Sequence, residues 1–226
     1  MTLLITESEA QGWLRDALGV NASGMARLSQ LVDLLLEENQ RQNLVARGTL
    51  PHVWVRHIVD SAQLLHVSRE TLPQGEWIDL GTGAGFPGIV IAALQPTRPV
   101  TLVDSRRLRT EWLQRVADAV ELPNVRVVLS RVEDLPSAPH GVISARAFAP
   151  LEKLLNISAR FSTPDTLWLL PKGAGAAQEL QMLPESWNHL FHVEHSLTDA
   201  AAGIITGRLL GQNTPPAHVH RQRGKK

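Results

Sequence analysis

Residues 79–88 read Asp79-Leu80-Gly81-Thr82-Gly83-Ala84-Gly85-Phe86-Pro87-Gly88, directly after the apolar pair Trp77-Ile78. A short apolar run that leads into a glycine-rich turn is typical of the first strand and first strand-to-helix turn of an open parallel sheet. Glycines at such a turn let the backbone bend tightly and approach a ligand, because no side chain stands in the way. The stretch therefore predicts an α/β fold with a ligand-binding turn.

Short apolar runs and helix-sized segments alternate along the chain after residue 70. The runs are Trp77–Leu80, Val100–Asp104, Val125–Leu129, Val142–Ala145 and Leu167–Leu170. This alternation predicts a mostly parallel, doubly wound, Rossmann-like sheet with right-handed crossovers. Two later runs, Phe191–Leu197 and Ile204–Leu210, predict an antiparallel pair that completes the sheet after a helix near residues 175–183.

The first third of the chain shows helical patterns instead. Thr6 and Glu9 have the spacing of a capping box, and within residues 23–43 apolar residues recur at i, i+3, i+4 and i+7, namely Leu28, Leu31, Val32 and Leu35. A third helix is predicted for residues 51–65. We expect an N-terminal helical extension over 1–70, an α/β domain over 71–211 and a flexible basic tail over 212–226.

Length and composition limit the class of protein. The 226 residues contain no cysteine, and their formal net charge is zero. No stretch approaches the roughly 20 apolar residues that cross a membrane, so we expect a soluble, cytoplasmic protein without a membrane partner. We also expect it to be a monomer. Neutrality gives no bulk indication of a nucleic-acid partner, which would need local basic patches.

The glycine spacing discriminates between ligands. A dinucleotide-binding turn follows G-x-G-x-x-G, whereas Gly81, Gly83 and Gly85 follow G-x-G-x-G. Pro87 removes a backbone N–H from the first helical turn, which suits a zwitterionic ligand better than a diphosphate.

Two acids strengthen this interpretation. Asp104 ends the second strand, where a carboxylate can accept hydrogen bonds from the hydroxyls of a ribose. Glu133 follows the third strand, where an acid can bind an adenine. Asp104 could instead cap the next helix, and Glu133 could be a solvated loop acid. Together with the turn, the two acids predict S-adenosylmethionine as the ligand.

The chain resembles the bacterial small-subunit ribosomal RNA methyltransferase G family, also called the glucose-inhibited division protein B family. The motifs that carry the resemblance are Asn39, Asn43-Leu44, His57 with Asp60-Ser61, Asp79 to Gly88, Leu102-Val103-Asp104-Ser105, Ser130-Arg131-Val132-Glu133, Ala145-Arg146-Ala147 and Lys172-Gly173. Glu38 and Gln40 depart from the family pattern, which usually has Trp and Lys at these positions.

The resemblance implies a class I methyltransferase that transfers a methyl group from S-adenosylmethionine to N7 of a guanine in 16S rRNA, with the small ribosomal subunit as partner. It implies that five residues line the cofactor, namely Gly81, Phe86, Val132, Glu133 and Arg146. The turn and strand pattern adds Asp79, Gly83, Gly85 and Asp104 to the predicted cofactor site.

The residues present agree with methylation of a ring nitrogen. C5 methylation of a pyrimidine needs a cysteine nucleophile, which this chain lacks. Exocyclic amino methylation commonly uses an Asn/Asp-Pro-Pro-aromatic motif after the fourth strand, where this chain has residues 144–148, Ser-Ala-Arg-Ala-Phe. Guanine N7 carries an in-plane lone pair and no proton, so its methylation needs alignment but no general base.

Three further side chains, those of His57, Asp60 and Lys172, are candidates for positioning the substrate, beside Arg146 of the predicted cofactor site. His57 and Asp60 share one helix face, where they could hold the guanine or the amino-acid end of the cofactor, or form a buried structural pair. Arg146 lies at the carboxyl end of a strand, which favours a role in the site over a surface ion pair. Lys172 could contact RNA or be an ordinary turn lysine.

Two charged groups give weaker signals. His189, His192 and His195 fall on opposite faces of a predicted strand, so we expect no metal site. Clustered cations could contact RNA phosphate or be solvated: Arg106, Arg107, Arg109 and Arg115, with Arg221, Arg223, Lys225 and Lys226 near the C-terminus.

Three competing functions stay open from the residues alone. They are a small-molecule methyltransferase with the same fold, a non-catalytic rRNA-binding factor and, against the glycine spacing, a nicotinamide dehydrogenase.

Overall fold

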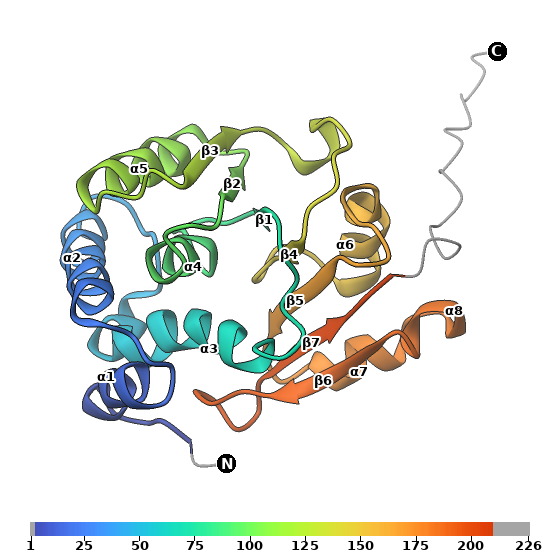
Figure 1. Ribbon diagram of the computed structural model, residues 1–226, viewed down its shortest axis with the longest axis horizontal. Helices are drawn as coiled ribbons and strands as arrows, with labels where there is room; N and C mark the ends of the chain where they lie inside the picture. The colour runs from blue at the N-terminus through green and yellow to red at the C-terminus, as the bar shows by residue number, and fades with distance from the viewer. Residues whose placement is uncertain (1–2, 210–226) are drawn as a thin grey trace.

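One sheet of seven strands organises the computed structural model, which describes residues 3–209 (Figure 1). In chain order the strands are β1 (Trp77–Leu80), β2 (Val100–Asp104), β3 (Val125–Leu129), β4 (Val142–Ser144), β5 (Leu167–Lys172), β6 (Phe191–His195) and β7 (Gly203–Gly207). Their spatial order is β3-β2-β1-β4-β5-β7-β6. The first five strands are parallel, and β7 runs antiparallel to both β5 and β6. The predicted fold class, including the antiparallel pair, is confirmed.

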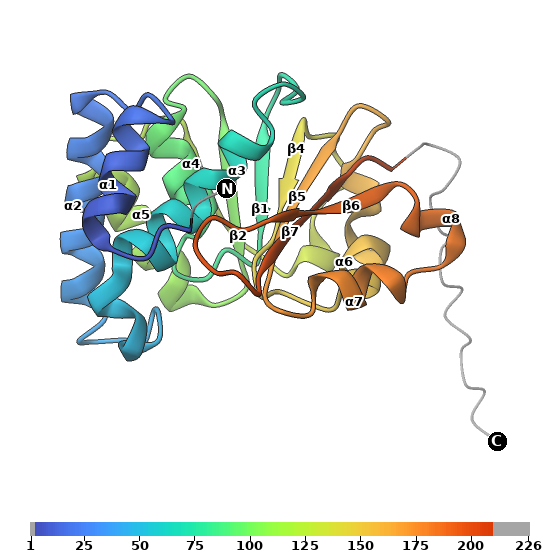
Figure 2. The ribbon, with the colours of Figure 1, turned by 90° about the horizontal axis from the view of Figure 1, so that it is seen from below.

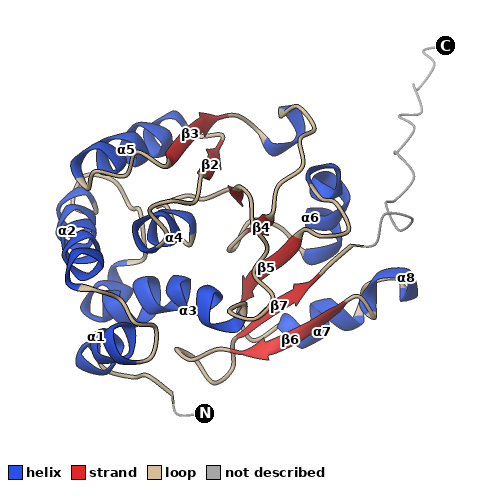
Figure 3. Cartoon of the chain, viewed as in Figure 1, coloured by secondary structure: helices blue, strands red, loops and turns tan. Residues whose placement is uncertain are grey.

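Helices cover both faces of this sheet (Figures 2 and 3). On one face lie α1 (Glu7–Asp16), α2 (Ala22–Glu38), α3 (Asp60–Val67), α4 (Gly88–Leu94) and α5 (Arg107–Ala119), and on the other α6 (Leu151–Ser158), α7 (Ala176–Gln181) and α8 (Glu185–Asn188). Successive β1 residues alternate between the two faces, since Trp77 joins the first core cluster and Ile78 the second. The helix predicted near residues 175–183 is confirmed as α7, whereas α8 was not predicted.

The first two helices follow their sequence signals. Thr6 and Glu9 form the predicted capping box at the start of α1, and the apolar stripe of α2 is buried in the same core cluster as β1 and β2. The prediction that the second helix runs to residue 43 was wrong, because α2 ends at Glu38. The Asn39 Oδ1 then accepts hydrogen bonds from the backbone N–H groups of Leu44 and Val45, which folds the chain away from the helix axis.

The helix predicted for residues 51–65 is confirmed, although it is not one regular α-helix. The segment consists of a 3-10 helix η1 (Arg47–His52), a π-helix η2 (Trp54–Val59) and α3, which continues to Val67. Glu7 of α1 accepts hydrogen bonds from the N–H groups of Trp54 and Val55, at 2.9 and 3.1 Å. These tertiary bonds supply acceptors for the first N–H groups of η2, which have no partner within the helix.

The remaining described elements are the short 3-10 helices η3 (Val132–Asp134) and η4 (Ala159–Phe161). Among the described residues, no helix is long and apolar enough to span a bilayer. The predicted tail over 212–226 lies outside the described residues.

Candidate functional site

Two cavities lie at the carboxyl ends of the parallel strands, near the point where the chain crosses from β3 back to β4 beside β1. The small cavity, of about 320 Å³, is lined by residues that include Gly81, Asp104, Val132 and Glu133. The large cavity, of about 840 Å³, is lined by residues that include His57, Asp60, Arg146, Lys172, Glu179 and Asp199. Residues 147–149 border both cavities, so this loop separates two adjoining binding spaces.

The glycine turn forms one wall of the small cavity. Gly81 and Gly83 have positive φ angles of 67° and 60°, which side-chain-bearing residues rarely adopt. A Cβ atom on Gly81 would collide with the ring of Phe148, which packs against the turn from the loop after β4. Glycine at position 81 is therefore needed for both the backbone angle and the close packing of Phe148.

Asp79 lies beneath the turn and has no exposed surface. Its carboxylate accepts hydrogen bonds from the Gly88 N–H at 3.0 Å and from the Ser144 hydroxyl at 2.7 Å, and the Trp77 indole donates to that hydroxyl at 2.8 Å. Burial raises the pKa of Asp79 to about 6, against the lowering effect of these hydrogen bonds. Asp79 thus joins β1, β4 and the start of α4, and lines neither cavity.

Asp104 connects the end of β2 to the turn. Its Oδ2 accepts from the Gly83 N–H at 3.0 Å and its Oδ1 from the Arg106 N–H at 2.8 Å, and the residue also lines the small cavity. Asp104 is not the cap of α5, because the N-cap residue is Arg106 and no side chain caps this helix. Its place in the small cavity fits the interpretation as part of a ligand site. Val132 is buried and Glu133 is partly exposed, with its carboxylate 3.6 Å from Arg131.

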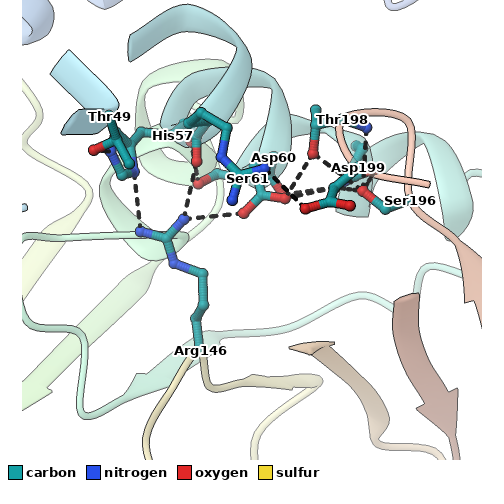
Figure 4. Close-up of polar contacts among 10 residues, drawn as sticks. Thr49, His57, Asp60, Ser61, Arg146, Ser196, Thr198 and Asp199 are labelled. Carbon is teal, nitrogen blue, oxygen red and sulfur yellow. Dashed lines mark hydrogen bonds and ion pairs between the residues drawn. The ribbon is translucent and has the colours of Figure 1, made fainter. Parts of the chain in front are cut away.

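Arg146 is held in place at the edge of the large cavity by three groups from η2 and α3 (Figure 4). Its Nη1 donates to Asp60 Oδ2 at 3.0 Å and to the Arg56 carbonyl at 3.4 Å, and its Nη2 lies 3.5 Å from His57 Nδ1. The guanidinium also lies 5.2 Å from the centre of the Phe86 ring. His57 and Asp60, predicted as a pair, are thus brought together through Arg146, which lies between them.

His57 has no nitrogen free for proton transfer. Its ring stacks on Phe86 with centroids 5.2 Å apart, and its Nε2 lies 2.8 Å from the Thr49 hydroxyl, which donates to the Ala46 carbonyl at 2.7 Å. Burial, with the positive charges of Arg146 and Arg56, lowers the pKa of His57 to about 3, so the ring is neutral at pH 7. Because Nδ1 faces the Arg146 donor, Nε2 carries the hydrogen that Thr49 accepts.

Lys172, at the end of β5, is nearly enclosed, with 9% of its side chain exposed. Its ammonium group donates to the Ala149 carbonyl at 3.0 Å and to Glu179 at 2.8 Å, and Glu179 also accepts from the Leu151 N–H at 2.8 Å. Lys172 therefore fixes the loop between the cavities. No motif around Glu179 or Phe148 indicated their place at the site, because Glu179 depends on the packing of α7 beside β5 and Phe148 on the packing of its loop against the glycine turn.

The clustered cations of α5 divide by environment. Arg115 pairs with Glu38 at 2.8 Å, Arg106 lies near Asp104, and Arg109 donates to the Asn43 carbonyl, whereas Arg107 makes no ion pair with any described residue. Glu38 thus links α2 to α5. Of the three clustered histidines, His189 follows α8, and His192 and His195 lie in β6. Residues 3–209 contain no group of three metal-ligating side chains close enough to hold an ion.

Comparison with known proteins places this chain in a family. Residues 25–204 match the family model described as GidB, rRNA small subunit methyltransferase G. The chain belongs to the rRNA small subunit methyltransferase G family. It is 78% identical to the ribosomal RNA small subunit methyltransferase G of Novosphingobium aromaticivorans, over 97% of this chain and 95% of that protein. It is 56% identical to the protein of the same name from Erythrobacter litoralis, over 91% of this chain and 98% of the relative.

A solved structure supports the fold class. A methyltransferase from Geobacter sulfurreducens superposes with a TM-score of 0.56 at 14% identity, covering 79% of this chain and 90% of that one. At this identity the likeness concerns the fold alone. The predicted family and the Rossmann-like methyltransferase fold are both confirmed.

The residues present fit S-adenosylmethionine, the cofactor of this fold class. The small cavity combines a glycine turn for close backbone approach with the carboxylates of Asp104 and Glu133, which can accept from ribose and adenine. Beside it, Arg146 keeps N–H groups, including Nε, that no described residue engages, and a guanidinium suits the carboxylate of an amino acid. The donor set therefore matches a nucleoside joined to a zwitterion.

Proposed function

We propose that this chain methylates N7 of a guanine in 16S rRNA, acting on the small ribosomal subunit in the cytoplasm as a monomer without a metal ion. One observation carries the choice of atom. His57, which lines the large cavity, is neutral and has both nitrogens engaged. The carboxylates that line the same cavity are all in ion pairs, so the site offers no ready proton acceptor: Asp60 with Arg146, Glu179 with Lys172 and Asp199 with Arg56. Methylation of N7 removes no proton from the base in the transfer step, so it needs no proton acceptor.

In this proposal the small cavity holds the nucleoside part of S-adenosylmethionine and the large cavity admits the guanine. Asp104 and Glu133 accept from the ribose and adenine, while Val132 supplies an apolar wall. Arg146 donates its free N–H groups to the carboxylate of the methionine part. When bound, the cofactor supplies an electrophilic methyl group on a sulfonium sulfur.

The chain's own contribution is alignment. Lys172 and Glu179 fix the loop at residues 147–150, and Phe86 with His57 fixes the guanidinium of Arg146. These contacts exist before any ligand arrives, which lowers the entropic cost of bringing the guanine N7 in line with the methyl carbon. The ion pair of Arg146 with Asp60 leaves the site close to neutral, and therefore tolerant of the positive charge that moves onto the base.

The decisive experiment supplies labelled S-adenosylmethionine and 30S subunits from cells that lack this protein. We expect one 7-methylguanosine in 16S rRNA, found by nuclease digestion and mass spectrometry. A Gly81→Val variant, whose side chain meets the Phe148 ring, should incorporate none. Label in small metabolites but not in 16S rRNA would identify a small-molecule enzyme, and rRNA binding without label would identify a binding factor.

A further inference from the structure

The turn between β6 and β7, residues 196–202, reaches the site from the far end of the chain (Figure 4). Its Thr198 hydroxyl donates to Asp60 Oδ1 at 3.0 Å, and Gln63 Nε2 donates to the same oxygen at 3.1 Å. The other oxygen of that carboxylate, Oδ2, accepts from Arg146. The two oxygens of Asp60 thus have different partners: Oδ2 accepts from the cationic Arg146, and Oδ1 accepts from two neutral donors.

We propose that Thr198 is a positioning residue for the cofactor site, acting through Asp60 on Arg146, with Gln63 as its support. Two donors on Oδ1 fix the plane of the carboxylate, so that Oδ2 points at the guanidinium. Neither donor carries a positive charge, so neither competes with Arg146 for the ion pair. The inference rests on the proposed role of Arg146 in holding the carboxylate of S-adenosylmethionine.

The turn is itself held firmly enough to fix Asp60. The Leu197 N–H donates to Gln63 Oε1 at 2.8 Å, and the Leu4 N–H donates to the Leu197 carbonyl at 2.8 Å. Ser196 Oγ accepts from the Thr198 N–H at 3.1 Å, and both side chains are more than nine-tenths buried. A buried hydroxyl anchored on both sides can transmit a fixed geometry to its partner.

Arg146 needs such support because it lies on a short connection. It follows β4, which ends at Ser144, and precedes Ala147, whose φ of 52° is in the left-handed region. No helix or strand therefore fixes the start of its side chain. Its orientation depends on the groups contributed by η2 and α3, of which Asp60 is the charged one.

The test replaces the hydroxyl and keeps the shape, with Thr198→Val. We expect the Kd for S-adenosylmethionine, measured by calorimetry, to rise about three- to tenfold, because Asp60 loses one of the hydrogen bonds that fix its carboxylate against Arg146. Thr198→Ser should restore the wild-type Kd. Thr206→Val, at a buried threonine of β7 outside the network, is the matched control.

A double-mutant cycle separates positioning from stability. In an Asp60→Asn background, Thr198→Val should change Kd by less than about twofold, because its effect acts through Asp60. A lower Tm with unchanged Kd, or an equal loss of affinity in both backgrounds, would overturn the inference. If Thr198→Val does not fold, Thr198→Ala makes the same comparison.

Failure of the underlying proposal gives a different pattern. If Arg146→Ala leaves Kd for S-adenosylmethionine unchanged, the cofactor role of Arg146 is wrong, and the inference about Thr198 falls with it. If Arg146→Ala weakens binding and Thr198→Val does not, only the positioning role is wrong.

Discussion

Asp79 is an acid that the fold keeps away from water beneath the glycine turn. Its pKa of about 6 in the folded protein exceeds the 3.8 of a free aspartate, so between these values the native state binds more protons than the unfolded state. Stability that protonated Asp79 provides is present below pH 4 and is lost as the pH rises towards 6. The ionised carboxylate still binds Gly88 and Ser144, at the cost of its desolvation.

This difference predicts the pH dependence of an Asp79→Asn variant. Relative to wild type, its free energy of unfolding should rise by roughly 2–3 kcal/mol between pH 4 and pH 7.5, because asparagine avoids the cost of ionising a buried acid. Urea denaturation at several pH values measures this change. A stability difference between the two proteins that stays constant across that range would contradict the raised pKa.

The neutral ring of His57 leads to a second prediction about a single residue. Since its ring is neutral and both nitrogens are engaged, His57→Asn should lower kcat by at most about tenfold, through displacement of Arg146 rather than loss of a base. The kcat of wild type and variant should show the same pH profile between pH 6 and 8. Loss of an acidic limb in the variant, with a fall in kcat of a thousandfold or more, would identify His57 as a general base.

Single residues also show where prediction from the sequence ends. The positive φ angles of Gly81 and Gly83 follow from a local motif, so the turn could be predicted. The environment of Arg146 could not, because its partners Asp60 and His57 lie 86 and 89 positions earlier in the chain and reach it only through the fold. Thr198 is farther still, 138 positions from Asp60.

Among the elements, strands were easier to predict than the segment that carries His57. The central strands are covered on both faces, so each reads as a continuous apolar run. The segment from η1 to α3 has a helical pattern, but it changes from a 3-10 to a π to an α register, which the apolar spacing does not distinguish. The start of η2 is capped by Glu7 of another helix, a contact that local periodicity cannot reveal.

The contact from Glu7 predicts a cost for removing that carboxylate. Glu7→Ala leaves the N–H groups of Trp54 and Val55 without their acceptor, and should lower the free energy of unfolding by about 1–2 kcal/mol. Urea denaturation measures the loss. Glu70→Ala, at an exposed pair with Arg69, is the control and should change stability by less than about 0.5 kcal/mol. Equal effects of the two substitutions would mean that the contact does not stabilise η2.

At the scale of the whole molecule, the residues before and after the predicted boundary at residue 70 share one hydrophobic core. One cluster of buried side chains contains Leu28 and Leu35 of α2 together with Trp77 of β1 and Leu102 of β2. Polar contacts cross the same boundary, since Arg27 donates to the Ala93 carbonyl at 3.0 Å. The helical extension therefore covers a face of the sheet that would otherwise expose apolar surface.

A shared core predicts that the extension and the sheet unfold together. Amides of α2 and β1 should exchange with solvent deuterium through the same global opening, with equal free energies and equal dependence on denaturant. If α2 exchanged through a separate opening of lower free energy, the extension would be an independent unit. Joint unfolding matters for function, because η2 and α3 supply the groups that hold Arg146 while α1 and α2 hold η2 and α3 against the sheet. Loosening the extension should then weaken cofactor binding, because the extension carries the groups that hold Arg146.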